Sequence, residues 1–388
     1  MSLPSTTKAF TVNSIRSPPD ITINSIPVPN PVASGTCAVR ILAAYVSPGW
    51  PLFYDGTLSY LSFPLPFVPG SHAVGRVISA GPDAAQLRPG DLVFIDSYIR
   101  ARDDPTNTQI LLGLHEGSTE ASKRLMRDAW RDGVLRTVAT VPLENVNRLD
   151  ESAIDRLGYT PSELVIALSR LLVASGGVAA AHLRAGQTVI VGPATGHYSG
   201  AVAEVAVALG ARVIALGRDA TKLKAMSDAL ATIYPRSARI QTVETAGDAE
   251  TVTAAIRAAL PTGSAGADAF FDISPGSGIQ PAHIVPAFAA LRPGAKAILM
   301  GAIFGDLQVN YASILFRSIT IKGQYMYTRE NATQMMRMVE AGVVRIGKLA
   351  GHEVQGEFAL EDWEAAFVAL KGAHGWGKGV TFTPGDEA

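Results

Sequence analysis

The residues best suited to bind a ligand lie in one segment, Gln187–Gly200 (QTVIVGPATGHYSG). An apolar run, Val189–Val191, stops at Gly192 and a loop of small residues follows. A helix-like run, Ala201–Leu209, and a second apolar run, Arg212–Leu216, come next. This order of strand, tight turn, helix and strand sets a pyrophosphate on a helix N-terminus, where unpaired backbone N–H groups and the helix dipole favour negative charge. The segment predicts a dinucleotide cofactor, and therefore a redox enzyme.

The glycine fingerprint of this segment is degenerate. Counting back from Gly210, its three positions fall on Ala194, Gly196 and Ser199. Only the middle position, where the backbone comes closest to phosphate, keeps its glycine, although alanine and serine are small enough for the turn. These residues could instead form a tight turn only, but the complete strand and helix context favours a cofactor. The expected cofactor contacts are Gly192, Ala194, Thr195, Gly196, His197, Ser199 and, after a later predicted strand, Gly301.

The end of the second predicted strand indicates which dinucleotide binds. Proteins that bind NAD usually place Asp or Glu there, to accept hydrogen bonds from the ribose 2′-hydroxyl. Here the position is Gly217, and Arg218 follows it, with Lys222 one helical turn further on. A guanidinium pairs bidentately with a 2′-phosphate, whereas the alternative is that Arg218 is a solvated charge. Together with the missing acid, this predicts NADP(H), bound by Arg218 and Lys222.

Length and composition limit the class of protein. A chain of 388 residues is long for one core, so two domains are expected. The net charge of −1 gives no reason to expect nucleic acid or an anionic membrane as a partner. The single cysteine, Cys37, excludes an internal disulfide framework and a cysteine-rich zinc lobe. The first residues lack a signal pattern and the apolar runs are short, so we expect a soluble, cytoplasmic protein.

The predicted elements change character along the chain. Residues 1 to about 150 contain short apolar runs between Pro and Gly, such as Ala73–Ser79, as in a small barrel. From about residue 160, a helix over Pro161–Val173 opens an alternation of strands and helices that favours a parallel sheet covered on both faces. The strands are expected at Thr188–Val191, Arg212–Leu216, Arg239–Val243, Ala269–Asp272 and Ala297–Met300, with an edge strand at Ser318–Lys322.

Four motifs in a fixed order resemble the medium-chain dehydrogenase/reductase superfamily. They are Phe67–Gly75 (FVPGSHAVG), Leu87–Val93 (LRPGDLV), Leu291–Ala295 (LRPGA) and Glu357–Phe367 (EFALEDWEAAF). The resemblance covers nearly the whole chain. It implies an α/β fold in which a Rossmann doubly wound parallel sheet accompanies a GroES-like β-barrel domain. The implied GroES-like substrate domain is residues 1–155, completed by 325–388, and the implied Rossmann domain is 156–324.

Within that superfamily the chain is similar to zinc-free members. Zinc-dependent members carry a histidine directly after the first Pro-Gly, and here that residue is Ser71. Their earlier cysteine ligand falls near Ser47, while His72 is offset by one position and lacks cysteine partners. The resemblance is therefore to the quinone oxidoreductase and enoyl reductase branch, which uses NADPH without metal, and we expect no metal ligands.

The active-site pattern departs from that branch. Zinc-free quinone reductases carry Asn-Pro and, five residues after the Asn, a tyrosine, where this chain has Ser47 and Leu52. Tyr54 is either a substitute or an ordinary loop aromatic. The implied chemistry is hydride transfer from the nicotinamide to the activated double bond of an enone, enoyl thioester or quinone. Charge building on the carbonyl oxygen would be stabilised by Tyr54, Ser47, His72 or a backbone N–H.

The residues indicate the substrate and the partners less directly than the cofactor. An apolar small molecule is expected, and the aromatic residues that could line its pocket are Trp50, Phe53, Tyr54 and Phe304. Residues 143–200 also resemble fungal proteins of the superfamily, which implies a role in fungal secondary metabolism. The family further implies a homodimer through an edge strand near Ile314–Ile321. Two alternatives stay open: a non-redox isomerase, dehydratase or cyclase on the same fold, and a non-catalytic NADPH-binding protein.

Overall fold

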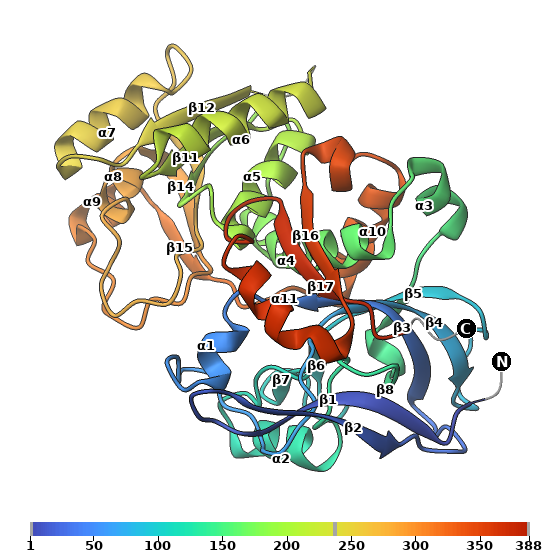
Figure 1. The fold of residues 1–388 in the computed structure, drawn as a ribbon. Helices are drawn as coiled ribbons and strands as arrows, with labels where there is room; N and C mark the ends of the chain where they lie inside the picture. The colour runs from blue at the N-terminus through green and yellow to red at the C-terminus, as the bar shows by residue number, and fades with distance from the viewer. Residues whose placement is uncertain (1–2, 236–238, 386–388) are drawn as a thin grey trace. The chain divides into compact units, whose positions relative to one another are not determined.

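The protein, represented by a computed structural model that describes residues 3–235 and 239–385, forms two compact units (Figure 1). Unit 1 comprises Met1–Ser169, Glu353–His374 and Lys378–Ala388, and unit 2 comprises Arg170–His352 and Gly375–Gly377. These divisions differ from the sequence-based boundaries at 155/156 and 324/325. The second boundary moves because residues after 324 are held by unit 2: the Arg345 backbone N–H donates to the Tyr234 hydroxyl at 2.9 Å.

Unit 1 is built on a seven-stranded sheet that joins the two ends of the chain. Its order is β16-β17-β3-β4-β5-β9, and β8 pairs with β3. The strands are β3 (Thr36–Val46), β4 (Ala73–Ala80), β5 (Leu92–Ile95), β8 (Val138–Pro142), β9 (Val146–Arg148), β16 (Glu353–Phe358) and β17 (Lys378–Phe382). Two hairpin sheets flank it: β1 (Thr6–Ser14) with β2 (Asp20–Pro27), and β6 (Tyr98–Arg100) with β7 (Gln109–Leu111).

Aromatic side chains fill the core of unit 1. Phe10 from β1 packs edge-on against Trp363 and tilted against Phe382, with ring centroids 6.3 and 5.9 Å apart. Such pairs stabilise a core beyond the area they bury. The C-terminal strand β17 and the helix before it are therefore part of the same core as the N-terminal strand. The helices of the unit are α1 (Trp50–Tyr54), α2 (Glu120–Asp128), α3 (Glu151–Leu157) and α11 (Trp363–Leu370).

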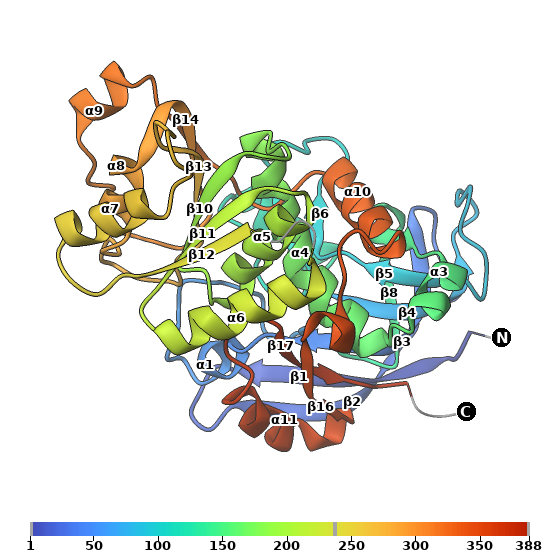
Figure 2. The same cartoon turned by 90° about the horizontal axis from the view of Figure 1, so that it is seen from above.

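Unit 2 confirms the predicted doubly wound fold. Its sheet is parallel throughout, in the order β12-β11-β10-β13-β14-β15, and Figure 2 shows the first five of these strands in succession. The order reverses between β10 and β13, which is where this fold opens its ligand crevice. The strands are β10 (Thr188–Gly192), β11 (Arg212–Gly217), β12 (Arg239–Glu244), β13 (Ala267–Asp272), β14 (Leu291–Leu299) and β15 (Thr320–Gly323).

Helices connect the strands of unit 2, and one of them is longer than predicted. The helices are α5 (His197–Ala208), α6 (Ala220–Ile233), α7 (Ala249–Ala258), α8 (Ile284–Ala289), α9 (Tyr311–Phe316) and α10 (Arg329–Glu340). Before them, α4 covers Pro161–Ala181, whereas the sequence predicted an end at Val173. The helix continues because Gly176 and Gly177 leave room for the Met326 carbonyl and the Met300 side chain. Within the part of the chain that the structure describes, α4 alone is long and apolar enough to cross a membrane, and 83% of its apolar window is buried inside the protein.

Candidate cofactor site

Three strand ends meet at the carboxyl edge of the parallel sheet. Gly192, the last residue of β10, is paired in register with Asp272, the last residue of β13. Gly301 follows β14, and a Cβ placed on it would lie only 2.8 Å from the Asp272 Oδ2 atom. The glycines therefore permit a close approach of backbone at the point where the strand order reverses. This is the expected place for a dinucleotide in such a sheet.

The helix that starts at this edge begins differently from its neighbours. Asp219, Asp248 and Thr328 cap α6, α7 and α10 with their side chains. The N-cap of α5 is Gly196, which makes no side-chain cap hydrogen bond. The first N–H groups of a helix lack intrahelical partners, so a helix without a capping side chain leaves its N-terminus open to an anion. The start of α5 therefore fits a pyrophosphate.

The turn before α5 is held by its own hydrogen bonds. The Ala194 N–H donates to the Leu216 carbonyl at 2.6 Å, which ties the turn to β11. The Ser199 hydroxyl donates back to the Pro193 carbonyl. The two residues that replace glycines of the fingerprint therefore stabilise the turn. Ala194 fits a fully buried position, and Ser199 closes the loop from the first turn of the helix. A preformed turn of this kind suits a ligand that is bound by backbone atoms.

Arg218 lies at the same edge of the sheet, directly after β11, and it is exposed. The next residue, Asp219, is a carboxylate that the sequence-based argument passed over. Its side chain accepts the Lys222 N–H at 3.0 Å, and this contact lowers the pKa of the Asp219 carboxyl. The Lys222 ammonium lies 3.6 Å from the same carboxylate. The Asp219 carboxylate therefore caps its own helix and pairs with Lys222. Of the two predicted cations, Arg218 is the better placed to bind a 2′-phosphate.

The buried side chain of His283 packs against the turn. The His283 Nε2 atom lies 2.9 Å from Asp272 Oδ1, and the Ser274 hydroxyl donates to the same oxygen at 2.7 Å. The histidine ring packs so closely on the turn that a Cβ on Gly192 would lie 2.6 Å from its Cδ2 atom. Sequence reasoning missed His283. The available signal was Asp272, an acid that directly follows the apolar residues Ala269–Phe271 at the end of β13.

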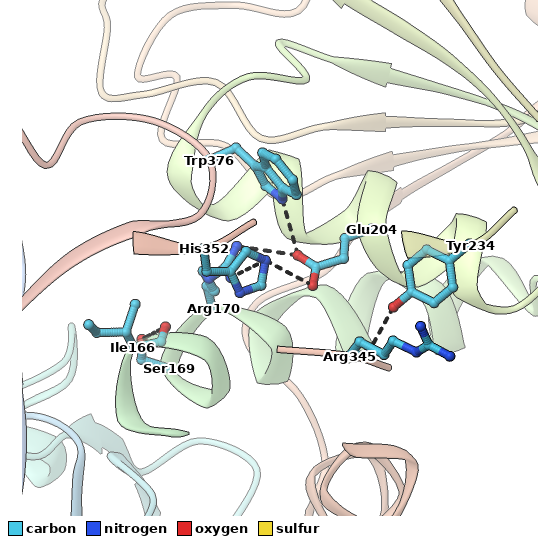
Figure 3. Close-up of polar contacts among 8 residues, drawn as sticks. All are labelled: Ile166, Ser169, Arg170, Glu204, Tyr234, Arg345, His352 and Trp376. Atoms are coloured by element: carbon cyan, nitrogen blue, oxygen red, sulfur yellow. Dashed lines mark hydrogen bonds and ion pairs between the residues drawn. The ribbon is translucent and has the colours of Figure 1, made fainter. Parts of the chain in front are cut away.

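A second buried cluster holds α5 itself (Figure 3). Glu204 on α5 is 1% exposed and faces Arg170, whose side chain is fully buried, at 3.4 Å, and His352 at 3.3 Å. The Trp376 indole N–H donates to the same carboxylate at 3.1 Å. Burial by itself would raise the pKa of the Glu204 carboxyl, but His352, Arg170 and the indole outweigh that effect and lower it. The cluster therefore holds a carboxylate that stays ionised.

Trp376 connects this cluster with the cofactor turn. Its backbone N–H donates to the Thr195 carbonyl at 3.1 Å. Its ring lies against α5, where a Cβ on Gly200 would come within 2.6 Å of it. One residue thus contacts the turn, the first turns of α5 and the buried Glu204. We infer that Trp376 positions the turn, a role that no local sequence pattern indicated.

The catalytic candidates of unit 1 fall into different environments. His72 is 5% exposed and lies between two hydroxyls, with Nδ1 3.0 Å from Ser71 Oγ and Nε2 3.1 Å from Ser97 Oγ. Burial lowers the pKa of His72 to about 3, so the ring is neutral near pH 7. Ser47 is half-buried and follows β3. Ser97, which sequence reasoning missed, comes two residues after the buried strand β5.

Tyr54 lies in the core of unit 1 rather than at its surface. It is 2% exposed, its ring contacts those of Trp50, Phe63 and Phe67, and no residue in the described ranges pairs with its hydroxyl. Burial raises the pKa of Tyr54 well above its usual value. Trp50 and Phe53 are buried as well, whereas Phe304, in unit 2, is 64% exposed. The structure brings Tyr54 together with core aromatics and not with the other catalytic candidates.

Residues suited to a metal do not gather in the described parts of the chain. Within residues 3–235 and 239–385 there is no group of three or more His, Cys, Asp or Glu side chains that could hold a metal ion. The one cysteine, Cys37, is buried in β3, and burial raises the pKa of its thiol to about 12.

Two family models match the sequence. The alcohol dehydrogenase GroES-like domain matches residues 33–151, and the family described as zinc-binding dehydrogenase matches residues 199–341. Together with the strand order of unit 2, these matches confirm the family predicted from the four motifs. The chain belongs to the medium-chain dehydrogenase/reductase superfamily of oxidoreductases. Among curated proteins, none matches the chain in a sequence search.

Solved structures with the same fold are distant in sequence. A crotonyl-CoA carboxylase/reductase is 16% identical over 100% of this chain and 90% of its own, with a TM-score of 0.77. A zinc-binding dehydrogenase from Sinorhizobium meliloti 1021, bound to NADP, is 19% identical over 98% and 100%, with a TM-score of 0.74. An NAD-dependent alcohol dehydrogenase is 21% identical over 97% and 99%, with a TM-score of 0.73. At these identities the likeness establishes the fold.

Proposed function

We propose that this protein is an NADPH-dependent, metal-independent reductase that transfers a hydride to an activated carbon–carbon double bond. The observation that carries the proposal is the carboxyl edge of the unit 2 sheet. There the uncapped N-terminus of α5 lies at the switch point of the strand order, and a cation follows the neighbouring strand. The NADP bound in one structural relative, and the reductase activity named for another, support the same reading.

The cofactor would be held mainly by backbone. We assign the pyrophosphate to the turn and the start of α5, and the 2′-phosphate to Arg218, with Lys222 as a weaker neighbour because it is shared with Asp219. Bound NADPH supplies the hydride. The residues assigned to the turn and to the nicotinamide end are Gly192, Ala194, Thr195, Gly196, His197, Ser199 and Gly301.

The carbonyl oxygen of the acceptor needs a hydrogen-bond donor as charge builds on it. We assign this role to Ser47, because it is the half-buried candidate. Neutral His72 would instead order the hydroxyls of Ser71 and Ser97. Tyr54 is a poor donor, because its hydroxyl is enclosed in the core and its raised pKa disfavours loss of the proton. An enone, an enoyl thioester or a quinone meets the requirement for an electron-poor carbon.

Metal independence rests on the two serines at the family's zinc positions, Ser47 and Ser71. Neither hydroxyl is a usual zinc ligand. We expect purified protein to contain no stoichiometric zinc by elemental analysis and to keep full activity in a chelator. About one tightly bound zinc per chain would overturn this part of the proposal.

The test is NADPH oxidation with one acceptor from each class, measured beside two controls. The first control is NADPH binding without acceptor, and the second is conversion of the acceptor without NADPH. Oxidation of NADPH with one reduced double bond per cofactor is the expected result. Conversion without cofactor would favour the non-redox isomerase, dehydratase or cyclase that the degenerate turn also allows. Tight NADPH binding with no conversion of any acceptor would favour a non-catalytic binding protein.

We also propose that the protein is a homodimer through the edge of the unit 2 sheet. β15 is the last strand of that sheet, so one side of its backbone has no neighbouring strand among the described residues. Apolar side chains of the preceding helix α9 are exposed beside it, with Leu315 at 58% and Phe316 at 84%. An open edge with exposed apolar side chains is a site for pairing with a second copy.

A further inference from the structure

A groove in unit 1 shares no residue with the cofactor site or with the hydroxyl groups around His72. It has a volume of about 890 Å³ and lies between the β1–β2 hairpin, the segment Pro66–Val68 and the residues that follow α2. Its lining combines polar and charged side chains with apolar ones, of which Ile26, Phe67 and Trp130 are among the larger. This volume is within the range of small-molecule sites.

One wall of the groove carries a buried arginine that forms no direct ion pair among the described residues. Arg136 is 7% exposed, and its Nη2 atom donates to the backbone carbonyls of Asp132 and Thr140, each at 3.3 Å. Its Nε atom is enclosed and has no hydrogen-bond partner among the described residues. The Asp132 carboxylate acts on it only through space and raises its pKa. Burial lowers the pKa of Arg136 to about 10, so the group is still charged near pH 7. A buried charge of this kind is costly unless something pairs with it.

The other charges around the groove neutralise one another. Arg127 pairs with Asp128 at 2.9 Å, and Arg131 pairs with Asp132 at 3.1 Å. These two ion pairs leave the guanidinium of Arg136 as the net charge of the lining. The groove is therefore selective for an anion, and its single unpaired cation matches a single negative charge.

A hydroxyl lies on the same side of the chain as this arginine. Ala9 of β1 forms an antiparallel bridge with Arg136, so their side chains lie on the same face. Thr11 is two residues further along β1 and shares that face. Its hydroxyl is enclosed and has no partner in residues 3–235 or 239–385, and it also lines the groove. The Arg136 Nε atom and the Thr11 hydroxyl, which both lack hydrogen-bond partners among the described residues, thus belong to two residues that line one cavity.

We propose that this groove binds a small organic acid with one carboxylate and an apolar body. The carboxylate accepts hydrogen bonds from the Arg136 guanidinium and the Thr11 hydroxyl, and the apolar body lies along Phe67 and Trp130. Guanidinium pairs with carboxylate in a planar, bidentate geometry. A single net cation disfavours a dianion such as phosphate, because half of the charge of the dianion would stay unneutralised.

The test is calorimetric titration of the full chain with octanoate, with octanamide and inorganic phosphate as matched probes. Octanoate should bind, octanamide should bind about tenfold or more weakly, and phosphate should not saturate the site. Arg136→Met keeps the length of the side chain and should weaken octanoate binding about tenfold or more. The double variant Arg127→Gln with Asp128→Asn, which removes both charges of one ion pair at the same groove, should leave the affinity within about twofold.

Two further measurements keep the test decisive if Arg136→Met folds poorly. Thr11→Val keeps the shape of the side chain and should also weaken octanoate binding, since it removes one donor. The circular dichroism spectrum and the thermal unfolding midpoint should be unchanged in either variant, which reports that the chain is folded. Equal octanoate affinity in wild type and in both variants, or equal binding of octanamide and octanoate, would overturn the proposal.

Discussion

Replacement of Glu204 by glutamine tests whether the buried cluster of unit 2 stabilises the cofactor helix through charge. The substitution keeps the size of the side chain and removes its negative charge. Arg170, whose side chain is fully buried, then loses its counter-ion. Removing one partner of a buried ion pair costs about 3–5 kcal/mol. This is a large part of the usual stability of about 5–15 kcal/mol of a folded domain.

The double variant Glu204→Leu with Arg170→Met is the control. It removes both charges and puts apolar side chains of similar size in their place, a change that is often neutral or stabilising in other proteins. We therefore expect it to be more stable than Glu204→Gln. The two outcomes separate the loss of a charge from a general intolerance to substitution at this position.

The stability conferred by the Glu204 carboxylate should also depend on pH. The folded state lowers the pKa of the Glu204 carboxyl below its ordinary value of 4.5. The carboxylate therefore contributes stability above its unfolded pKa, and this contribution is lost as the pH falls through the folded value. Urea unfolding, followed by tryptophan fluorescence at pH 7 and pH 4, should show a smaller gap between wild type and Glu204→Gln at the lower pH. A destabilisation of less than about 1 kcal/mol at pH 7, or a double variant as unstable as the single one, would refute this reasoning.

Three further predictions follow from other contacts. The pKa of His72 is about 3 in the folded state and near 6.5 in the unfolded state, so the unfolding free energy of wild type should fall by about 2 kcal/mol between pH 7 and pH 5. The unfolding midpoints of His72→Gln should lack this pH dependence. Parallel curves for the two proteins would contradict the prediction. Gly192→Ala should destabilise by about 1–3 kcal/mol, since its Cβ would lie 2.6 Å from the His283 ring; thermal melts check this, and His283→Ala in the same chain should restore stability. Phe316→Glu should convert a dimer into a monomer in light scattering, and a monomeric wild type would exclude the proposed interface.

The sequence was sufficient to predict those elements whose structure depends on residues close together in the chain. The predicted strand Thr188–Val191 lies within β10, and the predicted strand Ala269–Asp272 lies within β13, because short apolar runs between glycine turns specify buried parallel strands locally. The helix predicted over Pro161–Val173 is too short, because α4 continues through Gly176 and Gly177 to Ala181. Both glycines are sites where a distant backbone and side chain pack on the helix.

The parts of the site that were missed depend on contacts across the sequence. Trp376 meets Glu204 from 172 positions away, and nothing near either residue announces the pairing. Asp219 lies close to the strand end where a carboxylate would indicate NAD, but it caps α6, and the sequence alone does not show that role. Tyr54 shows the reverse problem: sequence alone does not distinguish an active-site tyrosine from a core aromatic, and only its burial does.

The central claim is a nicotinamide cofactor site at the carboxyl edge of the unit 2 sheet that selects NADPH through Arg218. Its most direct test is a titration of NADPH and NADH against wild type, Arg218→Ala and Lys224→Ala. Lys224 is a suitable control because it is an exposed cation on α6 that pairs with Asp228 at 2.6 Å.

Wild type should bind NADPH more tightly than NADH. Arg218→Ala should weaken NADPH binding by a factor of about 10–150, the equivalent of a charge-assisted contact of about 1.5–3 kcal/mol. Neither Arg218→Ala nor Lys224→Ala should change NADH affinity, and Lys224→Ala should leave NADPH affinity within about twofold. Equal affinity of wild type for the two cofactors, or an unchanged preference in Arg218→Ala, would contradict the account.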